Sequence, residues 1–100
     1  MRYTIRFKSK AYSDIDQLKE FILKQCAAPL TARRQFELLD KHLDWLEEHA
    51  ELSGVDVELS IQYGQIMRNV PFGKKMAIIY SVEGNIVYIH RIMPQSMIIF

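Results

Sequence analysis

Apolar and polar residues alternate from residue 2 to residue 7, which is the period of a strand with one buried face. The apolar positions are Tyr3, Ile5 and Phe7. Apolar residues then recur every three or four positions, which predicts an amphipathic helix. We expect Ser9 to cap this helix, with Asp14 and Asp16 in its early turns, where acids suit the helix dipole.

The first helix carries an apolar stripe of Ile15, Leu18, Ile22 and Cys26. We expect it to end before Pro29, because the residue that precedes a proline avoids the α region. A second and longer helix is predicted from Thr31 to about Ala50. Its apolar stripe is Phe36, Leu39, Leu43, Leu46 and Ala50. Two such helices joined by a few residues predict an antiparallel helical hairpin.

The region after the helices predicts strands. After Ser53-Gly54, residues 55–63 alternate loosely and indicate either an extra strand or an extended linker. Residues 65–70, 74–82 and 86–93 are the three strands of a predicted meander. We expect Pro71-Phe72-Gly73 to form the first turn and Gly84-Asn85 the second, a two-residue hairpin connection.

The predicted fold is α+β and forms a single domain over residues 1–100. A strand, a helical hairpin and a three-stranded antiparallel meander follow one another along the chain. The helices must pack on one face of the sheet, because a two-layer domain buries their apolar stripes there. We expect the other face of the sheet to be open and lined by the outward residues of the meander.

Composition limits the class of protein. With 49% hydrophobic and 25% charged residues, the chain is outside the disordered class. The one cysteine, Cys26, cannot form an intrachain disulfide. No secretion signal opens the sequence, and no apolar run approaches the ~20 residues needed to cross a bilayer. We therefore expect a cytoplasmic protein with no membrane partner.

The net charge is only +1, but the charges are unevenly distributed. The basic residues of the last third are Arg68, Lys74, Lys75, His90 and Arg91. Glu83 is the only acid after Glu58. This asymmetry predicts a basic sheet surface and favours a polyanion or an acidic protein as the partner.

Three stretches of the chain resemble a known family. They are residues 3–18 (YTIRFKSKAYSDIDQL), the helix pair, and residues 68–93, in which 78–83 (IIYSVE) and then 87–92 (VYIHRI) are similar to the central hairpin of the family. Together they are similar to the RelE/ParE superfamily of small toxins from bacterial toxin–antitoxin operons. The resemblance implies a toxin that arrests growth and is neutralised by a cognate antitoxin, a segment of which orders as it binds.

Members of this superfamily are either ribosome-dependent mRNA endonucleases, as in the RelE branch, or inhibitors of DNA gyrase, as in the ParE branch. The fold does not distinguish the two. For an endonuclease, the resemblance implies that Arg68 and Arg91 are catalytic, face the open side of the sheet and grip a phosphate. Lys74 and Lys75 would join Arg68 in binding nucleic acid. The alternative is that these side chains are solvated, with Lys75 keeping a sheet edge soluble.

Histidines and tyrosines give weaker signals. His90 adjoins Arg91, so on a regular strand it points to the opposite face, and we expect a hydrogen-bonded core histidine. His42 and His49 are seven positions apart, too far for a typical two-histidine metal site, and are expected at the surface. We therefore predict no metal and no cofactor. Tyr80 and Tyr88 are expected in the core, with base stacking as the alternative.

The end of the chain departs from the endonuclease pattern, because no Tyr, Lys or His follows Arg91. The apolar residues 97–100 are expected to be buried as an extra strand, a homodimer contact or an antitoxin-binding edge. Three interpretations stay open at this point: an mRNA endonuclease, a gyrase inhibitor, and a catalytically inactive protein-binding module.

Overall fold

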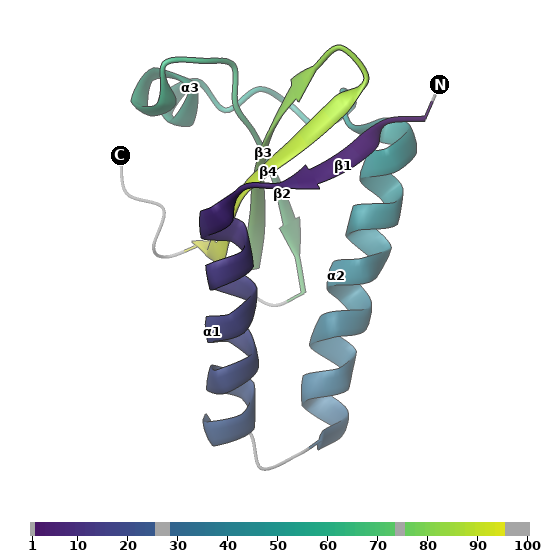
Figure 1. Ribbon diagram of the computed structural model, residues 1–100, viewed down its shortest axis with the longest axis vertical. Helices are drawn as coiled ribbons and strands as arrows, with labels where there is room; N and C mark the ends of the chain where they lie inside the picture. The colour runs from purple at the N-terminus through teal and green to yellow at the C-terminus, as the bar shows by residue number, and fades with distance from the viewer. Residues whose placement is uncertain (1, 26–28, 74–75, 96–100) are drawn as a thin grey trace.

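The computed structural model describes residues 2–25, 29–73 and 76–95. Within these ranges one sheet has the strand order β1-β4-β3-β2 (Figure 1). The elements in chain order are β1 (Thr4–Phe7), α1 (Ser9–Gln25), α2 (Pro29–His49), α3 (Val57–Tyr63), β2 (Arg68–Phe72), β3 (Met76–Glu83) and β4 (Ile86–Pro94). Strand β1 pairs parallel with β4, and the other neighbours are antiparallel. The predicted α+β fold of strand, helical hairpin and meander is confirmed.

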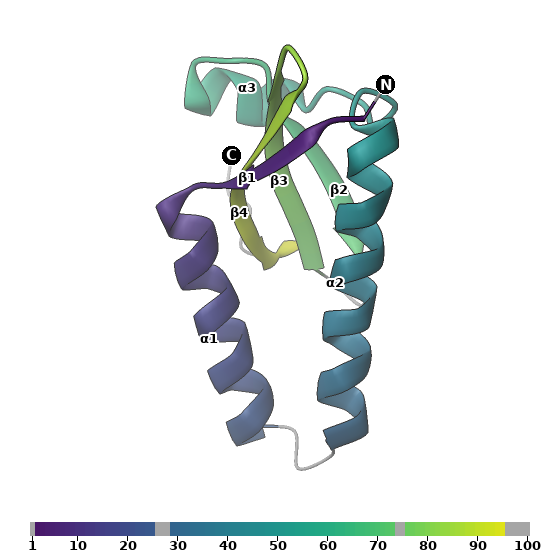
Figure 2. The same ribbon diagram turned by 45° about the vertical axis from the view of Figure 1, so that its right-hand side comes forward.

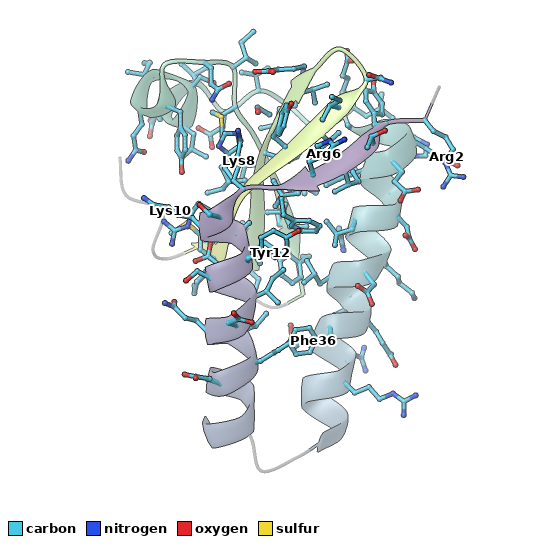
Figure 3. All side chains as sticks on the ribbon, in the orientation of Figure 1. Arg2, Arg6, Lys8, Lys10, Tyr12 and Phe36 are labelled. Atoms are coloured by element: carbon cyan, nitrogen blue, oxygen red, sulfur yellow. The ribbon has the colours of Figure 1, made fainter. Side chains whose placement is uncertain are left out.

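The helices α1 and α2 cover one face of the sheet, as predicted. Figures 1 and 2 show them side by side, with their far ends extending past the sheet. The main core lies between the two layers and consists of Ala11, Leu39, Leu46, Ala50, Phe72, Ile78, Tyr80, Val87, Ile89 and Ile92. Phe36 lies between the two helices and packs against this core (Figure 3). Burial of these apolar side chains holds the helical hairpin on the sheet.

The helix boundaries differ from the prediction by one or two residues. Ser9 is the first residue of α1, and the carbonyl of Lys8 accepts the hydrogen bond of the Tyr12 amide, so Lys8 occupies the cap position. Helix α2 begins at Pro29 rather than Thr31, because a proline in the first helical position loses no hydrogen bond. Cys26 lies outside the described residues.

The segment predicted as a strand or linker contains helix α3, so that prediction is wrong. The Asp56 side chain caps its first turn by accepting the amide of Leu59 at 3.0 Å. Gly64 ends it in the left-handed conformation at φ 71°. Val55 alone shows strand-like pairing, through an isolated antiparallel bridge to Arg68. Local capping therefore prevailed over the loose alternation.

The second face of the sheet is only partly open. Leu59 of α3 packs there with Met67 and Ile79 in a small second core, and Met93 lies against it. The turns also differ in part from the prediction. Pro71 and Phe72 belong to β2, whereas Gly84 adopts φ 61° in the predicted hairpin connection. In the described part of the chain, none of the helices is long and apolar enough to cross a membrane.

Candidate functional site

Arg91 forms a bidentate ion pair with the buried carboxylate of Asp14. Its Nε donates to Asp14 at 2.7 Å, and its terminal nitrogen donates to the other Asp14 oxygen at 3.0 Å. The hydrogen bond to Asp14 is the main reason why the pKa of Arg91 is raised. Asp14 is 8% exposed and also accepts the backbone amide of Ile92 at 2.9 Å.

The sheet topology explains this arrangement. Strand β1 ends at Phe7, which is paired with Ile89, so the rest of β4 has α1 beside it in place of a strand. Asp14 supplies the acceptor that a neighbouring strand would have supplied to the Ile92 amide. From the sequence, the only role expected for Asp14 was a favourable interaction with the helix dipole. Asp14 lies beyond the first turn of α1, so the dipole does not explain its position.

Arg68 faces the helices. It pairs directly across from Tyr80, which belongs to the main core, so both side chains lie on the helix side of the sheet. Its guanidinium donates to the backbone carbonyls of Glu51, at 3.2 Å, and of Ser53, just after α2. The expectation that Arg68 and Arg91 line one open surface is therefore wrong. Their catalytic role stays a prediction.

A β-bulge changes the direction of the His90 side chain, which precedes Arg91. Tyr80 pairs with Ile89 and Ile79 pairs with Arg91, which leaves His90 as an extra residue in β4. His90 therefore points away from the helices, and its Nε2 lies 2.8 Å from the hydroxyl of Ser81. The expectation of a core histidine facing the helices is wrong, because the bulge breaks the alternation on which it rested.

The environment of His90 disfavours the charged form of its ring. Burial lowers the pKa of His90, and the nearby Lys8 ammonium lowers it further. The Tyr63 ring of α3 meets the imidazole edge-on, with ring centroids 5.5 Å apart. This small cluster combines an imidazole, a hydroxyl and an aromatic ring on the face away from the helices.

The N-terminal strand and the residue that follows it add two basic side chains that were not among the expected site residues. Arg6 and Lys8 are exposed and follow one another along the β1 edge of the sheet (Figure 3). Arg6 is paired with Tyr88, and the Lys8 ammonium lies 4.5 Å from the centre of the Tyr88 ring. The alternation of residues 2–7 indicated that Arg6 lies on the polar face of the first strand. The alternation does not show that this strand pairs with β4.

The other candidate residues are placed as follows. Tyr80 is buried, as predicted, and its hydroxyl donates to the Ala50 carbonyl at 2.7 Å. Tyr88 is only half-buried. His42 and His49 are also half-buried rather than fully at the surface, and each has its Nδ1 near a carbonyl of the preceding helical turn. Lys74, Lys75 and residues 97–100 lie outside the described residues.

A cleft opens between α1 and the end of β4. Its volume is about 240 Å³, and most of its wall is apolar. The lining residues are Asp14, Gln17, Leu18, Met76, Arg91, Ile92, Met93 and Pro94. The cleft can hold an apolar side chain next to the Asp14–Arg91 pair. Among residues 2–25, 29–73 and 76–95, no group of three or more His, Cys, Asp or Glu side chains could hold a metal ion.

Comparison with solved structures gives a similar fold. The chain superposes on a chain of the chromosomal ParDE toxin–antitoxin system from P. aeruginosa with a TM-score of 0.71. The match covers 93% of this chain and 96% of that chain at 17% sequence identity. At this identity the likeness supports the fold alone. None of the curated protein sequences matches this one.

A family model gives the more specific result. Residues 5–99 match the family described as the ParE toxin of the type II toxin–antitoxin system parDE. This match spans nearly the whole chain and includes the helical hairpin, α3 and all four strands of the sheet except the first residue of β1. The chain therefore belongs to the ParE toxin family and is the toxin of a type II toxin–antitoxin pair, with an antitoxin protein as its partner.

Proposed function

We propose that this toxin arrests growth by binding and inhibiting DNA gyrase, and that it does not cleave mRNA. The observation that carries the proposal is the position of the two arginines expected to grip a phosphate. Arg68 is bound to backbone carbonyls on the helix side, and Arg91 is bound to Asp14 at the edge of β4. Two guanidiniums held on different sides of a sheet cannot clamp one phosphate. The ParE family match supports the same choice.

An RNA-cleaving enzyme needs more than one cation. It needs a base for the 2′-hydroxyl, stabilisation of the charged transition state and a donor to the leaving oxygen. One observation favours this second candidate function: the bulge brings His90 to the face away from the helices, where burial lowers its pKa and so favours the neutral ring. The bond between His90 and Ser81 occupies one of the two ring nitrogens.

The antitoxin is proposed to dock at the cleft between α1 and β4. A segment that orders on binding could insert an apolar side chain beside Leu18 and Ile92, and an acidic residue of the same segment could approach Arg91. We further propose that the toxin acts in the cytoplasm. A homodimer through residues 97–100 stays a prediction.

The experiment separates the two mechanisms. Purified toxin is titrated into a supercoiling assay with purified gyrase, alone and with its antitoxin. In parallel, mRNA 5′ ends are mapped shortly after the toxin is induced in a bacterial culture. Inhibition that the antitoxin reverses, without new mRNA ends, supports the proposal. Codon-phased ends that disappear in a His90→Gln variant of unchanged melting temperature would instead establish an endonuclease.

A further inference from the structure

Strand β1 is paired on one side only. It comes first in the strand order β1-β4-β3-β2, so it forms an edge of the sheet. The amides of Thr4 and Lys8 donate toward β4, to backbone carbonyls at 2.8 and 2.9 Å. Alternate residues make these bonds in a parallel ladder, so the amides and carbonyls of Ile5 and Phe7 point away from β4. An edge of this kind is a template for another strand.

The free part of this edge is short and has defined ends. The amide of Tyr3 also points away from β4, but it donates to the Glu47 carbonyl at the end of α2, at 2.6 Å. Beyond Phe7 the chain enters α1 at Ser9. Among the described residues, no hydrogen-bond partner is found for the outward amides and carbonyls of Ile5 and Phe7. They can therefore bind a short extended segment.

The side chains along this edge alternate in character. Ile5 and Phe7 pack against the main core, on the side of the helices. Tyr12 of α1 is 59% exposed and lies beside Phe7, with ring centroids 5.4 Å apart (Figure 3). Arg6 and Lys8 are exposed on the opposite face of the sheet. A strand added here would place alternate side chains over the aromatic pair and beside the two cations.

The charge at this edge is positive and is not neutralised by an ion pair. The ion pairs of the described chain join other residues, and they are Arg2–Glu47, Arg33–Glu37 and Asp14–Arg91. Glu47 lies at the opposite end of β1 from Lys8, next to Arg2. The exposed acid Glu83 belongs to β3, and β4 separates it from β1. Arg6 and Lys8 are thus free to face an acidic segment.

We propose that a segment of the antitoxin adds to the sheet as a strand beside β1, and that this segment alternates apolar with acidic residues. Its backbone bonds to Ile5 and Phe7. Its apolar side chains cover Phe7 and Tyr12. Its acidic side chains face Arg6 and Lys8 on the other side of the sheet.

This inference rests on one part of the proposed function, in which a segment of the antitoxin orders as it binds the toxin. It adds a second contact to the one proposed at the cleft between α1 and the end of β4. The inference does not depend on how the toxin arrests growth. Backbone pairing at β1 gives the segment affinity, and the alternating side chains give it specificity.

A second copy of the chain fits this edge less well. In a two-fold pairing of β1 with β1, the free groups of Ile5 would meet those of Phe7 in the other copy. Arg6 would then lie directly opposite Arg6 of the other copy, and like charges in that position are destabilising. A pairing centred on Ile5 would need the amide of Tyr3, which the Glu47 carbonyl already occupies.

The test measures amide hydrogen exchange by NMR, residue by residue, in the free toxin and in its complex with the purified antitoxin. In the free toxin the amides of Ile5 and Phe7 should exchange fast, whereas the amide of Arg6, which points to β4, should exchange slowly. In the complex, exchange at Ile5 and Phe7 should slow by at least about tenfold, because each amide is then bonded to the added strand.

Charge reversal tests the contribution of the side chains. Arg6→Glu/Lys8→Glu should weaken antitoxin binding by at least about tenfold. The matched control is Lys19→Glu/Arg34→Glu, which makes the same change in net charge at exposed positions of α1 and α2 and should leave the affinity unchanged. The melting temperature of each variant shows whether it is folded. Binding of the unaltered toxin should also weaken as salt is raised.

Amides of Ile5 and Phe7 that exchange as fast in the complex as in the free toxin would overturn the inference. Leu18→Ser, in the wall of the cleft, keeps the two contacts distinguishable. Weaker binding of this variant, without protection at Ile5 and Phe7 in the unaltered complex, would remove the added strand and leave the cleft as the docking site. Protection at Ile5 and Phe7 in a toxin dimer, before antitoxin is added, would assign the edge to a second copy.

Discussion

Asp14 and Arg91 lie 77 positions apart in the chain and form a two-pronged ion pair between α1 and β4. The same carboxylate accepts the backbone amide of Ile92. Asp14 therefore does two tasks at the edge of β4: it replaces the missing strand partner and it holds the arginine. The first helix is attached to the sheet by a polar contact as well as by apolar packing.

Asp14→Ala should destabilise the protein strongly. The change leaves the Ile92 amide without its acceptor and Arg91, itself partly buried, without its counter-charge. Removal of one partner from such a buried arrangement costs about 2–4 kcal/mol of the free energy of unfolding. Urea unfolding followed by circular dichroism measures the difference. Asp16→Ala on the exposed side of the same helix is the control and should change the stability by less than about 0.5 kcal/mol.

The same pair affects how Arg91 variants are read. Arg91→Ala leaves a buried carboxylate without its cation, so a loss of toxicity can come from a loss of structure. A double-mutant cycle with Asp14→Ala and Arg91→Ala separates the two, with a coupling of more than about 1 kcal/mol expected. Additive effects of the two single changes on stability would contradict the structural role proposed for the pair.

Several elements of the fold could be predicted because their signals are local. The alternation up to Phe7 gave β1, the helical stripes gave α1 and α2, and Gly84 gave the β3–β4 turn. Helix α3 was missed because its residues also alternate. Its true signals were the capping Asp56 and the terminating Gly64, which enclose the seven residues of the helix.

The directions of the candidate site residues could not be predicted, because they depend on strand register. Arg68 turns toward the helices since it pairs with Tyr80, and a shift of one residue would have reversed it. His90 turns the other way because one extra residue enters β4. Asp14 contacts Arg91 only because β1 ends at Phe7. The end of that strand cannot be inferred from either Asp14 or Arg91.

The stability of the protein should fall in mildly acidic solution because of His90. Burial and Lys8 lower the folded-state pKa of His90 below its ordinary value of 6.5. As the pH falls, the unfolded chain therefore binds a proton before the folded one does, and the stabilisation present above the unfolded pKa is lost. His90→Gln should flatten the stability profile between about pH 7 and pH 5.

Lys8 should be one cause of that shift, and NMR titration of the imidazole tests it. Lys8→Ala should raise the pKa of His90 toward its ordinary value, since the lysine disfavours the charged ring. Lys10→Ala, two positions further along, is the matched control. An equal pKa of His90 in the unaltered toxin and in Lys8→Ala would show that burial alone causes the shift.

Tyr80→Phe should cost about 1–2 kcal/mol of the free energy of unfolding, because the buried carbonyl of Ala50 loses its donor. Burial raises the pKa of Tyr80 above its ordinary value of 10.0. The stabilisation that Tyr80 provides is therefore complete below its pKa in the unfolded chain. It is lost as the pH rises through its higher pKa in the folded protein. Alkaline unfolding should be less steep in Tyr80→Phe than in the control Tyr88→Phe, which keeps its ring beneath Lys8.

Asp56→Ala should loosen α3 without unfolding the rest of the protein. The side chain of Asp56 satisfies the Leu59 amide in the first turn, and loss of such a cap costs about 1 kcal/mol. Because α3 is a short helix with a single fully buried residue, this loss should appear as faster hydrogen exchange in residues 57–63 while β3 keeps its protection. Glu58→Ala in the same turn is the control for removing a charge. Uniformly faster exchange across α3 and β3 would mean that α3 is part of the main cooperative unit.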